Sequence, residues 1–177
     1  MPCLREIIRM IPAFVFIGLY SKNINLKFKE LFSFKFNYKI FSVFLGIFLL
    51  YFFVVSFYNY GNLHLNPKYT RFYDIILWLL LGICQELVFR GWSFYAFYSV
   101  TSRKNAIILS SIFFATSHWF AYFWNLNLDI LKILNVTVFT FTFGVAMCFI
   151  LIKSKNKSIV PCIILHTLWD FLSIAIN

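Results

Sequence analysis

The sequence predicts an all-α membrane protein, a polytopic bundle of about five transmembrane helices preceded by a short N-terminal helix that is interfacial or re-entrant. The first observation behind this prediction is composition: 62% of the 177 residues are hydrophobic and 12% are charged, whereas soluble domains carry roughly 25% charged residues. The second is the aromatic content of 23%, with 25 phenylalanines, which suits lipid-facing surfaces and interfacial belts. The third is a succession of apolar runs near the ~20 residues that cross a bilayer.

The apolar runs predicted as spans are separated by polar or basic connections. In chain order they are Ile40–Tyr58, Phe72–Val100, Ala106–Trp124, Ile130–Ile152 and Ile159–Ile176. Residues 7–20 are also apolar but short for a crossing, so we place the interfacial or re-entrant helix there. We predict that residues 1–70 supply N-terminal membrane segments and a basic loop, and that residues 71–177 form the core of one integrated bundle.

Basic residues concentrate in alternate connections. The formal net charge is +10, and the segments Ser21–Lys39, Thr101–Asn105 and Lys153–Ser158 hold five, two and three of the 16 Lys and Arg residues. By the positive-inside rule these segments are cytoplasmic and the C-terminus faces outside. The first segment interleaves lysine with leucine and phenylalanine, which favours contact with anionic lipid headgroups; a plain basic loop is the alternative. No pattern of a nucleic-acid module appears, so no nucleic-acid partner is expected.

The stretch Gly82–Trp92 places Gln85, Glu86 and Arg90 within an apolar run. A charged side chain at membrane depth costs roughly 2.5–3.5 kcal/mol even on insertion scales, so something must offset that cost. Glu86 and Arg90 are four residues apart, with the glutamate on the N-terminal side. This is a spacing at which two charged side chains on a helix can pair. We predict an ion pair that supports the structure rather than the chemistry.

Two later spans add His118, His166 and Asp170 at similar depth. His166 and Asp170 are four residues apart and share a helix face, where a carboxylate can orient an imidazole. Ionisable groups inside a membrane usually face the bundle interior and mark function. We therefore predict that these three residues converge with Gln85 and Glu86 on one polar cavity, which opens towards the basic, cytoplasmic face of the cell membrane.

Three short patterns stand in order along the chain: Gln-Glu-Leu-Val-Phe-Arg at 85–90, Phe-Ala-Thr-Ser-His at 114–118 and His-Thr-Leu-Trp-Asp at 166–170. They resemble the EExxxR, FxxxH and HxxxN/D motifs of the CPBP (Abi) family of intramembrane proteases, which includes type II CAAX prenyl endopeptidases and bacteriocin-processing proteins. Order, spacing and membrane setting agree over roughly residues 71–176. Each pattern alone is weak, but three in order are specific.

The resemblance implies roles for these residues. Gln85 and His118 would hold the attacking water. His166 and Asp170 would face the scissile carbonyl, with Asp170 protonated or only orienting the histidine, and the ion pair of Glu86 would support the helix geometry. The family has a glutamate where this chain has Gln85, and loss of a general base typically costs about 10²–10⁴-fold in rate. The chain is then an inactive or repurposed member, an engineered Glu→Gln trap, or a peptidase in which Glu86 or His118 takes over as base.

The leading function is therefore an intramembrane endopeptidase that hydrolyses a peptide or membrane-anchored protein at the cytoplasmic membrane face without a cofactor. One alternative is a zinc-dependent protease with its ligands among four residues, although no HExxH motif is present: His118, His166, Asp170 and Glu86. Another is a non-catalytic protein that binds a peptide, such as a bacteriocin self-immunity factor, which the glutamine favours. A third is a transporter with a proton path, but paired interrupted half-helices are missing from the pattern.

Overall fold

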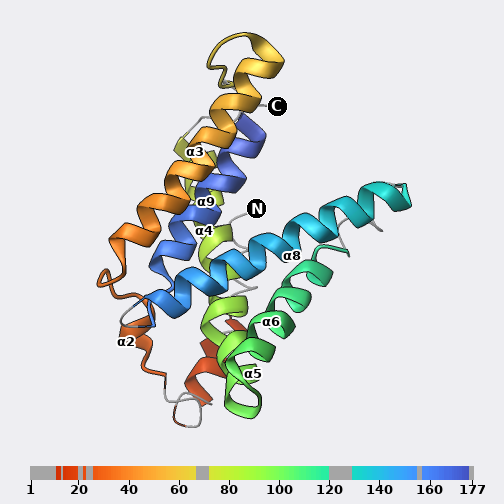
Figure 1. Cartoon of the computed structure of the whole chain (residues 1–177). Helices are drawn as coiled ribbons and strands as arrows, with labels where there is room; N and C mark the ends of the chain where they lie inside the picture. Colours follow the sequence, from red (N-terminus) through yellow and green to blue (C-terminus); the bar gives the residue numbers. More distant parts are fainter. Residues whose placement is uncertain are drawn as a thin grey trace.

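The computed structural model describes residues 11–12, 14–19, 22, 26–66, 72–119, 129–154 and 157–175. Every regular element in these residues is helical, which confirms the predicted all-α fold (Figure 1). The elements are α2 (Phe28–Leu31), α3 (Tyr38–Tyr60), α4 (Phe72–Glu86), the π-helical segment η2 (Leu87–Ser93), α5 (Phe94–Val100), α6 (Arg103–Ser117), α8 (Ile130–Lys153) and α9 (Val160–Ala175).

Three helical segments of the described chain are long and apolar enough to cross a membrane: Tyr38–Tyr60, Phe72–Val100 and Ile130–Lys153. The chain is therefore a multi-pass membrane protein. The other two predicted spans correspond to α6 and α9, which have 15 and 16 residues. At about 1.5 Å per residue, each of these helices is about 22–24 Å long, shorter than the hydrocarbon core. The total number of crossings stays a prediction.

Capping side chains explain why several helices exceed the apolar runs that predicted them. Asn37 Oδ1 accepts a first-turn N–H at 3.3 Å at the start of α3. Gly61 ends the same helix at φ 71°, in the left-handed conformation that glycine tolerates. α6 begins at Arg103, ahead of the predicted start, because the Ser102 hydroxyl caps its first turn at 3.3 Å. Polar caps therefore set boundaries that hydrophobicity alone misses.

Two helix pairs form the centre of the bundle: α6 packs along α8, and α4 packs along α9. Glycines allow both approaches. A Cβ atom on Gly144 of α8 would lie 3.1 Å from the Cα atom of Ser111 in α6. A Cβ atom on Gly82 of α4 would overlap the Thr167 side chain of α9 and lie 3.3 Å from its backbone nitrogen. Small residues at such contacts let membrane helices approach closely.

The long helix predicted over Phe72–Val100 is continuous, but its middle part η2 is π-helical. π-Helical turns are rare and often occur at functional sites. The carbonyl of Phe89 accepts the N–H of Phe94 and also the hydroxyls of Ser93 at 2.8 Å and Ser110 at 2.9 Å. Because Ser110 belongs to α6, these bonds fix the π-helical turn against the neighbouring helix.

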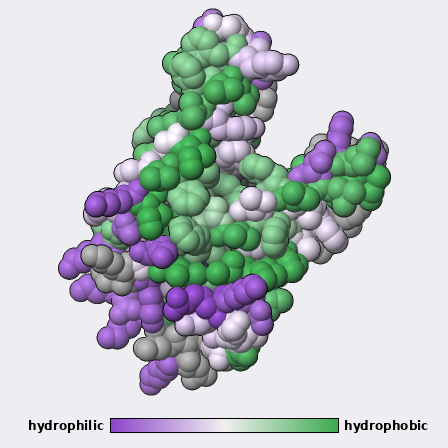
Figure 2. All heavy atoms as spheres, viewed as in Figure 1, coloured by the Kyte–Doolittle hydropathy of each residue, from purple (hydrophilic) through white to green (hydrophobic). Residues whose placement is uncertain are grey.

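The basic segment before α3 is packed onto the bundle. Three of its apolar residues, Leu26, Leu31 and Phe36, are buried in protein, whereas Phe34 is exposed. Its lysines at 22, 27, 29, 35 and 39 are also exposed. The carbonyl of Leu31 accepts the backbone N–H of Ile159 at 2.9 Å. The segment therefore covers the end of the bundle that carries the basic loops, and Figure 2 shows hydrophilic residues gathered there.

Some sequence expectations fall outside the described residues, namely the chain before residue 11 and residues 120–128, which include the end of the predicted span Ala106–Trp124. Within the predicted N-terminal helix, residues 14–19 are helical. Ile17 is fully buried, and the Phe16 ring stacks on Trp92 with 4.8 Å between centroids. This helix therefore packs against η2, and its interfacial or re-entrant nature stays a prediction.

Gly82→Ala should destabilise the protein, because the added methyl group overlaps Thr167 at the contact between α4 and α9. Overpacking costs about 1–3 kcal/mol, more than the ~1 kcal/mol by which alanine is favoured over glycine in a helix. Gly46→Ala in α3 is the matched control, since a Cβ atom there meets nothing within 4 Å. Thermal unfolding in detergent should give a lower Tm for Gly82→Ala alone. Equal Tm values would contradict the close contact.

Candidate active site

Glu86 lies at the middle of the segment Phe72–Val100 and is fully buried. Its Oε1 atom has two partners: Arg90 Nη1 at 3.0 Å, from the following turn, and His166 Nδ1 at 2.6 Å, from α9. An isolated buried carboxylate would be very costly, so these contacts are what allow a charge here. The predicted ion pair of Glu86 with Arg90 is confirmed. The contact with His166 was not predicted.

Arg90 is also fully buried and has partners on neighbouring helices. Its Nη2 atom donates to the carbonyl of Gly144 in α8 at 3.4 Å. Its guanidinium carbon stands 4.4 Å from the ring centroid of Phe114 in α6, a cation–π distance. The guanidinium therefore connects its own segment with α6 and α8, as a residue with a structural role would.

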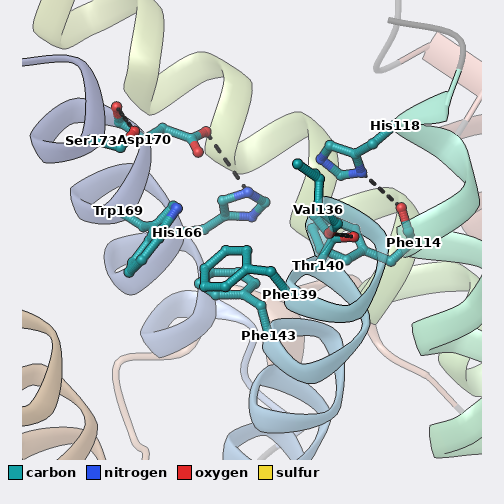
Figure 3. Close-up of a pocket in the computed structure, with 10 residues that line it drawn as sticks. All are labelled: Phe114, His118, Val136, Phe139, Thr140, Phe143, His166, Trp169, Asp170 and Ser173. Atoms are coloured by element: carbon teal, nitrogen blue, oxygen red, sulfur yellow. Dashed lines mark hydrogen bonds and ion pairs between the residues drawn. The ribbon is translucent and has the colours of Figure 1, made fainter. Parts of the chain in front are cut away.

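His166 lies between two carboxyl groups. Its Nδ1 is 2.6 Å from Glu86 Oε1, while its Nε2 is 3.7 Å from Asp170 Oδ2, close enough for an ion pair but long for a hydrogen bond. An ionised carboxylate only accepts, so Nδ1 carries the proton in the contact with Glu86. That bond fixes the ring and leaves Nε2 directed towards the Asp170 side of the site (Figure 3).

His118 directly follows the last turn of α6, and a hydrogen bond to that helix holds its ring. Its Nδ1 is 2.8 Å from the carbonyl oxygen of Phe114. A carbonyl oxygen only accepts, so Nδ1 carries the proton of the neutral ring and Nε2 keeps its lone pair. The Phe114 ring packs edge-on against both imidazoles, with centroids 4.7 Å from His118 and 5.6 Å from His166. His118 can therefore accept a hydrogen bond from water at Nε2.

One cavity of about 220 Å³ between α6, α8 and α9 is lined by His118, His166 and Asp170. The other lining residues are Phe114, Val136, Phe139, Thr140, Phe143, Trp169 and Ser173. In the view of Figure 3, His166 lies between Asp170 and His118. An apolar, aromatic wall with a few polar groups is typical of ligand sites. Three of the five residues predicted to share a cavity therefore line one cavity.

The position of this cavity along the helices differs from the expectation. Its lining residues lie in the C-terminal half of α6, the N-terminal half and middle of α8, and the middle and C-terminal half of α9. The basic segments Thr101–Asn105 and Lys153–Ser158 adjoin the opposite ends of these helices. The position of the cavity therefore does not support the expectation that it opens towards the basic face.

Gln85 and Glu86 are not among the residues that line the cavity. Glu86 acts on it through His166. Gln85, near the end of α4, is half-buried. Gln85 Oε1 and Glu86 Oε2 are buried oxygens without a hydrogen-bond partner in the described part of the chain. Buried acceptors are normally satisfied, so these two oxygens are exceptions within the described residues.

The residues suggested as zinc ligands do not form a ligand set in this arrangement. Within the described residues, no group of three or more His, Cys, Asp and Glu side chains could hold a metal ion. Glu86 Oε1 is bonded to Arg90 and His166, and His118 Nδ1 is bonded within its own helix. Zinc needs three or four protein ligands at about 2.0–2.3 Å. The zinc alternative therefore has no ready ligand set among the residues that the structure describes.

Two further polar residues of the cavity, Thr140 and Ser173, were not predicted. Ser173 had a signal, because it follows Asp170 by three residues and so lies on the same helix face. Thr140 had none, because α8 carries several threonines and the sequence does not mark which one faces inward. The bond between Glu86 and His166 also lacked a local signal, since 80 residues separate the two.

The helices of this chain bury an ion pair and gather two histidines and an aspartate around one cavity. This arrangement is typical of membrane proteins with a polar site inside the bilayer. Residues 68–172, more than half of the chain, match the family described as type II CAAX prenyl endopeptidase Rce1-like. The chain belongs to this family. The match spans all three motif segments, 85–90, 114–118 and 166–170, and confirms the resemblance. Comparisons with curated proteins and with solved structures return no match.

Arg90→Ala should reduce folding, because it leaves Glu86 buried with only His166 as a partner. Removing one partner of a buried pair costs about 3–5 kcal/mol. The matched control is Arg103→Ala at an exposed position, where a change within about 0.5 kcal/mol is expected. Purified yield and Tm in detergent report the difference. An Arg90→Ala protein that accumulates and melts like Arg103→Ala would show that the structural assignment is wrong.

Proposed function

We propose that the chain is an intramembrane endopeptidase that binds an extended segment of a peptide or membrane-anchored protein in the cavity of His118, His166 and Asp170. Its hydrolytic rate is low, because Gln85 stands where the resemblance puts a glutamate base. The observation that carries the proposal is the shared cavity, with His166 held by Glu86 behind it. The family assignment supports the coarse activity.

Peptide hydrolysis needs an activated water, stabilisation of the carbonyl oxygen and a proton for the leaving nitrogen. Water attacks the scissile carbonyl carbon; a base takes one proton from the water and passes it to the leaving amine as the C–N bond breaks. His118 Nε2 accepts a hydrogen bond from this water, since Nδ1 is committed to a carbonyl. His166 and Asp170 face the carbonyl oxygen. A protonated Asp170 donates to this oxygen, whereas an ionised Asp170 orients His166 only when Nε2 is protonated as well as Nδ1.

The weak step is the first proton transfer. The amide of Gln85 keeps the shape and hydrogen bonding of a glutamate but cannot take a proton. His118 would have to become a partly buried imidazolium, which is costly unless an anion lies close by. The Glu86 carboxylate is a poor substitute, because Arg90 and His166 already share its Oε1 atom. Binding should therefore survive better than turnover.

A second candidate function follows from the same glutamine. A chain that binds a peptide in the cavity without cutting it would act as a scaffold or as a bacteriocin self-immunity factor. Gln85 favours this reading, because it removes a base while leaving the cavity residues in place. The two functions differ in one measurable respect: restoring a carboxylate at this position creates turnover only in the first.

We place the protein in the cell membrane, with the basic segment before α3 against anionic lipid headgroups. Two observations support this placement. The lysines of the segment are exposed, while its leucines at 26 and 31 are anchored in the bundle. Lysine side chains near a leaflet attract anionic lipid by about 1 kcal/mol each.

Gln85→Glu should raise peptidase activity by about 10²–10⁴-fold, because it supplies the missing base. The measurement is cleavage of a membrane-anchored peptide library by purified full-length protein, with binding followed in parallel. Asn105→Asp is the matched control, since it adds an acid at an exposed position outside the cavity. A double variant, Gln85→Glu with His118→Ala, should lose the gain.

The outcomes separate the candidate functions. Strong cleavage by the native chain, unchanged by Gln85→Glu, would overturn the base assignment. Binding without cleavage in both forms would favour the non-catalytic protein. Inhibition of either form by a chelator would restore the metal alternative.

A further inference from the structure

The candidate cavity and the basic loops lie towards opposite ends of the same helices. Lys153 ends α8 and Lys157 precedes α9, whereas Thr140 and Ser173 of the cavity lie further along these helices in the other direction. At 1.5 Å per residue, Thr140 and Lys153 are about 20 Å apart along α8. In Figure 1 the N-terminal end of α8 and the C-terminal end of α9 diverge, and Figure 2 shows the surface hollowed between these two arms.

The basic end of the bundle, in contrast, is covered by the segment that precedes α3. The carbonyls of Leu31 and Ser33 accept hydrogen bonds from the Ile159 backbone N–H and the Ser158 hydroxyl. The Leu31 side chain is 0% exposed, and its Cδ1 atom would lie 3.7 Å from a Cβ atom built on Gly91 in η2. This segment therefore reaches the π-helical turn and lies between that turn and the basic face.

We infer that substrate enters the candidate site from the end of the bundle opposite the basic loops, which the positive-inside rule makes the extracytoplasmic face. The inference rests on the proposed function for its substrate. The access route itself rests on where the cavity lies and on the covered basic end. The cytoplasmic access expected from the sequence followed the charge of the loops alone and did not include the packing of the segment before α3.

This route defines the class of substrate as a peptide segment exposed at the outer face of the membrane, such as the part of a membrane-anchored protein just outside the bilayer. The cavity volume of about 220 Å³ is below the roughly 300–1,000 Å³ of drug-sized ligand sites. It therefore admits a few extended residues rather than a folded domain. The rings of Phe139, Phe143 and Trp169 favour large apolar side chains next to the scissile bond.

Cysteine accessibility in intact cells tests the route with the full-length chain. A membrane-impermeant maleimide is added before or after permeabilisation to variants carrying Thr140→Cys or Ser173→Cys in the cavity. Lys132→Cys marks the end of the bundle near the cavity and Asn105→Cys marks the basic end; both positions are exposed. Three native cysteines are buried: Cys84, Cys148 and Cys162. Cys3→Ser removes the fourth, and this background supplies the baseline.

The cavity variants should be labelled in intact cells as fully as Lys132→Cys, while Asn105→Cys should be labelled only after permeabilisation. Labelling of Thr140→Cys and Ser173→Cys with the pattern of Asn105→Cys would overturn the inference. Labelling of both only in detergent would overturn it too, because the cavity would then open to neither face.

A matched pair on the segment before α3 tests the covered end. Phe34 is 71% exposed and Leu31 is 0% exposed. In permeabilised cells Phe34→Cys should be labelled and Leu31→Cys protected; labelling of both would contradict the closure. None of these readouts needs catalysis. If Gln85→Glu gains no activity, the proposed function fails and the access route is unaffected. If the labelling contradicts the access route, the proposed function is unaffected.

Discussion

A carboxylate at the middle of a membrane helix must be neutralised and hydrogen-bonded, and this requirement organises the bundle. Glu86 meets it with Arg90 from the next turn and His166 from α9. Arg90 in turn contacts the Gly144 carbonyl of α8 and the face of Phe114 in α6. The buried ion pair of Glu86 and Arg90 therefore has contacts on every helix that lines the cavity. The glycine contacts between α4 and α9 and between α6 and α8 bring the backbones close enough for these bonds.

The same bond links structure to chemistry. Because Glu86 holds Nδ1 of His166, the other ring nitrogen is directed to the Asp170 side of the cavity, while His118 is anchored independently on α6. The two histidines are thus oriented by different helices before any substrate binds. Pre-oriented groups of this kind lower the reorganisation that catalysis requires. In the function proposed above, a glutamine at position 85 preserves this arrangement and lacks only the ability of a glutamate to take a proton. For this reason we expect substrate binding to be retained where turnover is lost.

The sequence predicted the helices, and three residues that line one cavity, better than it predicted the contacts between helices. Apolar runs located α3, α8 and α9 within about two residues, which is the precision expected at helix ends. The spacing of Glu86 and Arg90 predicted their ion pair, because both lie on one helix. The contact between Glu86 and His166 depends on how α4 and α9 pack at Gly82, and a single sequence does not show which helices are neighbours. The burial of Leu31 against the bundle was not predicted either, because it also depends on which segments are neighbours.

The central claim is that Glu86 and His166 act as one unit, and a double-mutant cycle on the free energy of unfolding tests it most directly. The free energy of unfolding is measured in one mild detergent for the native chain, Glu86→Gln, His166→Asn and the double variant. Residues in direct contact show coupling energies of about 0.5–3 kcal/mol. With a contact of 2.6 Å between buried groups, the account predicts a coupling of about 1 kcal/mol or more. Effects that add within about 0.3–0.5 kcal/mol would show that the two residues are independent and would contradict the account.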